Sequence, residues 1–170
     1  STFSKCSSLE KITICSSSIE IGPFAFSECI SLKQIITSSF SITKIDQGSF
    51  FGCASLKQIS ISTSLTKIGE YAFFRCSSLT QFMIPSSITQ VESYTFCGCS
   101  SLTQITIPSS VTEIESSAFM ECSSLNQIEI SSSVTKIRER TFFGCLSLKQ
   151  ITVPTSVTEI ENHSFYKCSS

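Results

Sequence analysis

The amino-acid sequence predicts a repeat solenoid of about seven coils, with a parallel β-sheet along one face and short strands and turns on the other. Eight cysteines recur in steps of 23 or 24 residues, from Cys6 to Cys168. A phenylalanine precedes each of them by three residues, and a leucine follows the first seven by three residues. One unit of this length cannot bury its own apolar side chains, so successive units must stack on one another.

The recurring cysteines and phenylalanines identify the interior of each coil. The cysteines that we expect in one buried ladder are Cys29, Cys53, Cys76, Cys99, Cys122 and Cys145. The matching core phenylalanines are Phe26, Phe50, Phe73, Phe96, Phe119 and Phe142. Free cysteine packs as a small hydrophobe, so we expect unbridged thiols, although stacked coils also satisfy the Cα distance of a disulfide. Cys15 and Cys97 fall outside the ladder, and we expect them to be the more reactive thiols.

Apolar and polar residues alternate after each leucine, as in Ile105-Thr106-Ile107, which is the spacing of a β-strand. Equivalent strands of successive coils must then run parallel, about 4.8 Å apart. We expect a second short extended segment at residues 111–114 and their equivalents. The arc before each cysteine lacks alternation, so we expect one or two turns of α- or 3₁₀-helix there. One unit carries an extra residue between Ile35 and Ile42, near Phe40, which we interpret as a bulge or a looser turn.

The outward side of the strands is the candidate binding face, because it presents aligned side chains from every unit. Its residues are Gln58, Gln81, Met83, Gln104, Thr106, Gln127, Glu129 and Gln150. Amide side chains also bond to one another along a stack, so the glutamine row could instead be a structural ladder between coils.

The consensus L-x-x-I-x-I-P-S-S-V-T-x-I-x-x-x-A-F-x-x-C, clearest at residues 102–124, resembles the BspA-type leucine-rich repeat. This is the Treponema-pallidum-type subclass with a 23-residue repeat, and the resemblance covers essentially the whole chain. It implies a leucine-rich repeat solenoid in surface proteins of mucosal bacteria or parasitic protists. It also implies adhesion to host matrix or to other cells, without catalytic chemistry.

The composition argues against several other classes of protein. The chain has 38 serines and 17 threonines, is 15% charged, and has a net charge of −1, whereas nucleic-acid surfaces need clustered cations. No apolar run approaches the roughly 20 residues of a membrane span. His163, the single histidine, sits at a freely variable unit position, so a base for nucleophilic catalysis is lacking. The cysteine spacing does not fit zinc pairs, and we expect no catalytic site, metal or cofactor.

We therefore expect a non-catalytic, extracellular or cell-surface module that binds proteins or glycans, with residues 1–170 forming one uncapped solenoid segment of a longer array. Two alternatives remain open. Uncapped coils could stack end to end into a structural filament. An intracellular scaffold in a reducing compartment would explain ten free cysteines. Asn162-His163-Ser164 is an N-x-S sequon, which makes Asn162 a candidate N-glycosylation site.

Overall fold

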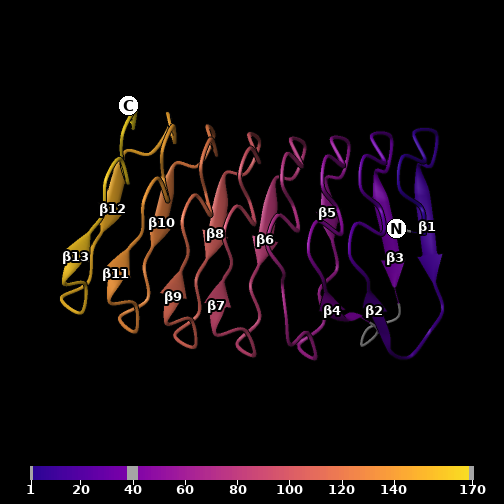
Figure 1. The fold of residues 1–170 in the computed structure, drawn as a ribbon, viewed down its shortest axis with the longest axis horizontal. Helices are drawn as coiled ribbons and strands as arrows, with labels where there is room; N and C mark the ends of the chain where they lie inside the picture. Colours follow the sequence, from indigo (N-terminus) through magenta and orange to yellow (C-terminus); the bar gives the residue numbers. More distant parts are fainter. Residues whose placement is uncertain (1, 38–41, 169–170) are drawn as a thin grey trace.

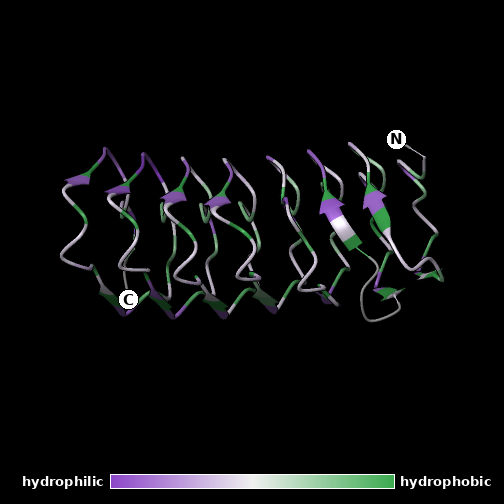
Figure 2. Ribbon diagram, turned by 90° about the horizontal axis from the view of Figure 1, so that it is seen from below, coloured by the Kyte–Doolittle hydropathy of each residue, from purple (hydrophilic) through white to green (hydrophobic). Residues whose placement is uncertain are grey.

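The computed structural model describes residues 2–37 and 42–168 of the 170-residue chain, so the surroundings of Phe40 lie outside the described residues. The chain forms a stack of coils, and two rows of strands run along different sides of it (Figures 1 and 2). Every strand pairing is parallel. The predicted parallel solenoid is therefore confirmed. Among the described residues no helix is long and apolar enough to cross a membrane.

The first row of strands lies at the L-x-x-I-x-I copies and forms two sheets. The three-stranded sheet consists of β1 (Lys11–Ile14), β3 (Gln34–Thr37) and β5 (Gln58–Ile59). The four-stranded sheet consists of β6 (Gln81–Met83), β8 (Gln104–Thr106), β10 (Gln127–Glu129) and β12 (Gln150–Thr152). Equivalent residues pair across coils, so Gln127 lies between Gln104 and Gln150. Each row of the sequence repeat is therefore also a row in space.

The second row of strands lies at the V-T-x-I copies, as expected. Its pairs are β2 (Ile19–Ile21) with β4 (Ile42–Ile45), β7 (Gln90–Val91) with β9 (Glu113–Ile114), and β11 (Lys136–Ile137) with β13 (Glu159–Ile160). These strands are short, and the described residues of this row form three separate two-stranded sheets.

The extra residue of the second unit lies in β4. Ile19 of β2 pairs with Ile42, but the next residue, Glu20, pairs with Lys44. Thr43 is therefore the additional residue, and the ladder absorbs it as a β-bulge. The sequence pattern predicts this residue before Ile42, whereas the strand pairing places it just after.

The arc before each cysteine is a series of turns, and the described residues contain no helix there. In every arc after the first, two residues have left-handed backbone, for example Tyr71 (φ 57°) and Arg75 (φ 55°), and such residues cannot continue a right-handed helix. The N–H of Arg75 donates to the carbonyl of Cys97 in the next coil at 2.7 Å. A helix would direct these hydrogen bonds within its own segment. Within the arc, bonds of the 3₁₀ type remain, such as that from the Cys76 N–H to the Phe73 carbonyl at 3.1 Å, but they alternate with bonds to the next coil, so the turns do not join into a helix.

The core consists of stacked rows of identical side chains. The phenylalanine rings of successive coils are stacked, with centroids 5.2 to 5.6 Å apart. Phe50, Phe73, Phe96, Phe119 and Phe142 have no exposed surface. Offset stacking adds to the free energy gained by burying each ring.

Each ladder thiol donates a hydrogen bond to the carbonyl of the phenylalanine one coil earlier. The Sγ–O distances in this ladder run from 3.0 to 3.3 Å. All six ladder cysteines are buried and none forms a disulfide. Burial raises the pKa of the Cys53 thiol to about 12 and the pKa of Cys76, Cys99 and Cys122 well above its ordinary value.

The two thiols outside the ladder differ from each other. Cys15 is exposed, so a reagent can reach it, and its higher reactivity stays a prediction. Cys97 is only 4% exposed, and burial raises its pKa to about 12. Burial thus disfavours the reactive thiolate at Cys97 as it does in the ladder, and the structure does not expose this thiol as it exposes Cys15.

Candidate functional site

The strand face is the outward side of β1, β3, β5, β6, β8, β10 and β12. Every candidate residue that the sequence indicates on β5 to β12 is exposed there, including Met83 with 76% of its surface accessible. The residue after each glutamine points inward instead, as Phe82 (6% exposed) and Ile105 (4%) do. This alternation follows from the opposite directions of successive side chains in a strand.

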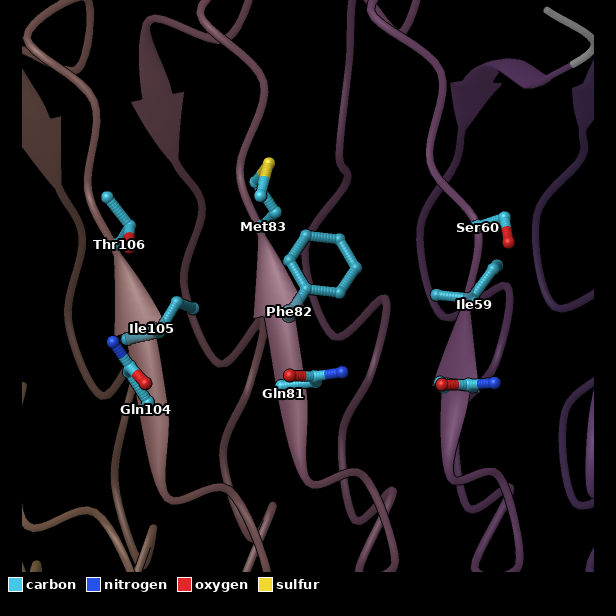
Figure 3. A pocket seen from close by; sticks show the side chains of 9 residues that line it. Ile59, Ser60, Gln81, Phe82, Met83, Gln104, Ile105 and Thr106 are labelled. Atoms are coloured by element: carbon cyan, nitrogen blue, oxygen red, sulfur yellow. The ribbon is translucent and has the colours of Figure 1, made fainter. Parts of the chain in front are cut away.

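The glutamine row presents free amide groups. Gln81, Gln104 and Gln127 lie at paired positions of adjacent strands, and Figure 3 shows the first two side chains on their neighbouring strands. Within residues 2–37 and 42–168, no side-chain hydrogen bond joins one glutamine of the row to the next. A glutamine amide does bond between coils on the other strand row, where Gln90 donates to Glu115. The row therefore does not use its amides to hold the coils together, and they remain available to a ligand.

A hollow of about 400 Å³ extends over β5, β6 and β8 on the strand face and includes the gap between β5 and β6. It is lined by residues 58–60, Gln81–Met83 and Gln104–Thr106 (Figure 3). In the described part of the chain, β5 and β6 belong to different sheets. The residues just before the two strands are linked by a hydrogen bond from the Thr80 N–H to the Lys57 carbonyl, 3.3 Å long. We call this feature the β5–β6 hollow.

The interruption of the sheet coincides with Phe82, the one aromatic residue in a row of isoleucines. Its ring lies 4.9 Å from that of Phe73 and 5.0 Å from that of Phe96, between centroids. Figure 3 shows the ring on the side of β6 that faces β5. A phenyl ring needs more room than the isoleucine of the other coils, which is consistent with the separation of the two strands at this point.

The centre of the strand face is uncharged. The outward residues of β6 and β8 are glutamine, methionine and threonine, and the nearest carboxylate farther along the row is Glu129 of β10. Lys57, just before β5, is exposed and has no ion-pair partner among the described residues. Lys33 in the preceding coil is paired with Glu10 at 3.0 Å. Lys57 therefore carries an unpaired charge, among the described residues, one position before Gln58 of the hollow.

The remaining candidate groups lie elsewhere. His163 is exposed on the turn arc, with its ring 5.6 Å from that of Tyr166, away from the strand face. Asn162, the candidate glycosylation site, is exposed beside it. Among the described residues, no group of three or more histidine, cysteine or acidic side chains could hold a metal ion.

The family model for the BspA type leucine rich repeat region matches residues 1–103 and 89–170, with six copies. The chain belongs to this BspA-type family. Its turn arcs, cysteine ladder and strand rows are therefore features of a BspA-type leucine-rich repeat solenoid. Comparison with curated protein sequences finds no match.

Several solved structures share this BspA-type architecture. The leucine rich repeat protein of T. pallidum is 28% identical, with a TM-score of 0.80, over 89% of this chain and 73% of that one. A leucine rich cell surface protein from Faecalibacterium prausnitzii is 30% identical, with a TM-score of 0.61, over 96% and 52%. A leucine-rich repeat protein from Eubacterium ventriosum is 26% identical, with a TM-score of 0.74, over 89% and 43%. The chain thus spans about half or less of the last two proteins.

The exposed rows are predictable from the sequence, whereas the β5–β6 hollow is not. Ile59 and Phe82 belong to a row that the repeat assigns to the core, so nothing marked them as part of a surface site. The available signal was the pair Phe82-Met83, because both residues depart from the Ile-Thr that the same positions carry in several other coils.

Proposed function

We propose that this BspA-type chain is a non-catalytic module that binds a protein partner through its strand face. The observation that carries the proposal is the row of exposed glutamine amides, repeated at the same position in successive coils, which form no side-chain hydrogen bond with one another in the described part of the chain. Each amide offers two donors and an acceptor, so the face presents aligned hydrogen-bonding groups across its whole length.

The area of the face determines how a partner can engage it. Stable protein interfaces bury about 1,000 Å² or more in total, and one coil offers only a few outward side chains. A partner must therefore cross several coils, and its affinity should increase with the number of coils it contacts. Weak contacts repeated along a surface suit attachment between cells or to a matrix.

We further propose that the chain acts at the cell surface, in adhesion. Support comes from the relative in Faecalibacterium prausnitzii, which is named a cell surface protein and matches over 96% of this chain. The alternatives are a glycan ligand, end-to-end assembly into filaments, and an intracellular scaffold.

A binding screen separates these possibilities. The chain is immobilised and exposed to purified matrix proteins, to neutral and anionic polysaccharides, and to intact cells. We expect saturable binding to at least one protein and to cells, with no saturable binding to polysaccharides. Binding to polysaccharides alone, or no binding together with concentration-dependent filaments in negative-stain micrographs, would contradict the proposal.

A further inference from the structure

We propose that the β5–β6 hollow is the anchor point of the strand face. In this inference, which rests on the proposed protein-binding function, the hollow takes an aliphatic side chain from an extended segment of the partner. An acidic residue next to that side chain pairs with Lys57.

The apolar part of the hollow suits an aliphatic side chain. Met83 is the most exposed large hydrophobic residue in the described part of the chain, at 76%. Half-buried Ile59 lies beside it in the lining, and Phe82, which is 6% exposed, forms the floor of the hollow. A thioether is flexible and polarizable, so it can pack against side chains of different shape. Interfaces concentrate their binding energy at such central apolar contacts.

The polar rim of the hollow suits a polypeptide backbone. Gln58, Gln81 and Gln104 surround the apolar wall, together with the hydroxyl groups of Ser60 and Thr106. Their amides can donate to carbonyls and accept from N–H groups of a segment that lies across the strands. An apolar centre surrounded by a few polar groups is the usual composition of a selective binding site.

The charge at the hollow favours an acidic neighbour on the partner. Lys57 is exposed one residue before β5 and is unpaired among the described residues, and the residues that line the hollow carry no charge of either sign. Complementary charge at an interface fixes orientation and speeds association. A partner segment with a glutamate beside a leucine would satisfy both Lys57 and the apolar wall.

The chain carries its own reporter for this site, because it contains two methionines, Met83 and Met120. With ¹³C-methyl methionine, Met83 reports on the hollow, and Met120, on a turn arc, is the internal control. The probe is the blocked tetrapeptide acetyl-Thr-Glu-Leu-Thr-amide, compared with the same peptide carrying Ser for Leu or Lys for Glu. We expect the first peptide to shift the Met83 methyl signal in a saturable manner and to leave Met120 unmoved. The Ser peptide should not bind measurably, and the Lys peptide should bind at least threefold more weakly.

Three variants complete the test. In each, one residue is replaced by the residue that another coil has at the same position of the repeat. Phe82→Ile should weaken the peptide at least fivefold, and Lys57→Thr at least threefold. Lys149→Thr, the same change in a distant coil, should have no effect. Equal binding of all three peptides, or loss of binding in Lys149→Thr alone, would overturn the assignment.

The peptide titration tests the hollow as a binding site, and the screen separately tests protein binding by the strand face. If the peptide shifts Met83 but the screen finds no protein partner, the hollow is a site and the proposed function is wrong. If a protein partner binds the strand face but the peptide leaves Met83 unmoved, the function stands and the anchor is assigned wrongly.

Discussion

Phe96→Ala should lower the free energy of unfolding by about 3–5 kcal/mol, because the cavity lies in the middle of a continuous stack. The ring of Phe96 is fully buried and stacks between those of Phe73 and Phe119, with centroids 5.5 and 5.6 Å away. It also contacts the tilted ring of Phe82 at 5.0 Å. Removing it leaves both neighbouring coils without a packing partner, and the backbone bonds between coils prevent them from closing the gap.

The matched control is Thr103→Ala in the same coil. Thr103 is exposed, and its hydroxyl donates only to the carbonyl of Thr80, at 3.3 Å. Its loss should change the free energy of unfolding by no more than about 0.5 kcal/mol. Urea titrations followed by circular dichroism measure both variants. Equal losses would mean that the inward and outward rows are assigned wrongly.

Raising the pH above about 9 should unfold the chain, because five of the six fully buried ladder thiols have a strongly raised pKa. These five are Cys53, Cys76, Cys99, Cys122 and Cys145; Cys29 is equally unexposed, but its pKa is raised less. Burial raises the pKa of each thiol above the ordinary 9.0, to about 12 for Cys53. In the unfolded chain the thiols lose their protons near pH 9, whereas in the folded chain they keep them. The unfolded state then binds fewer protons, so the free energy of unfolding falls as the pH rises.

The expected effect is large because the thiols act together. Each lowers the free energy of unfolding by up to about 1.4 kcal/mol per pH unit above the unfolded pKa, so five give roughly 7 kcal/mol per unit. Urea midpoints measured between pH 7 and 10.5 under a reducing agent test this. Cys99→Ser keeps a donor for the Phe73 carbonyl but removes one thiol, so the slope should fall by about one fifth. A midpoint that is the same at pH 7 and pH 10 would contradict the buried ladder.

The repeat made most of the fold predictable. Because units of one length must stack in register, the strand pairing of Gln104 with Gln127 follows from their spacing of 23 residues. The exposure of the glutamine row follows from the alternation within a strand. These features depend on periodicity, which a single chain displays in full.

Other features depend on backbone conformation and volume, which the period does not encode. The arcs lack alternation of apolar and polar residues, so their sequence predicts helical turns. However, residues such as Tyr71 and Arg75 adopt left-handed backbone without being glycine. Cys97 is off the ladder in sequence and is nevertheless buried. The β5–β6 hollow arises where Phe82 replaces isoleucine, a change that the consensus pattern treats as equivalent.

Charge placed on the strand face, compared with the same charge on the other strand row, tests most directly whether the strand face is the binding site. The first variant replaces Gln81, Met83, Gln104 and Thr106 with lysine. The control replaces Ser86, Thr89, Ser109 and Thr112, which are exposed in the same two coils beside β7 and β9. Affinity for the protein partner from the screen is measured by surface plasmon resonance, and circular dichroism confirms folding. We expect at least a 100-fold loss for the strand-face variant and no more than a threefold change for the control. A folded strand-face variant that keeps its affinity while the control loses it would contradict the account.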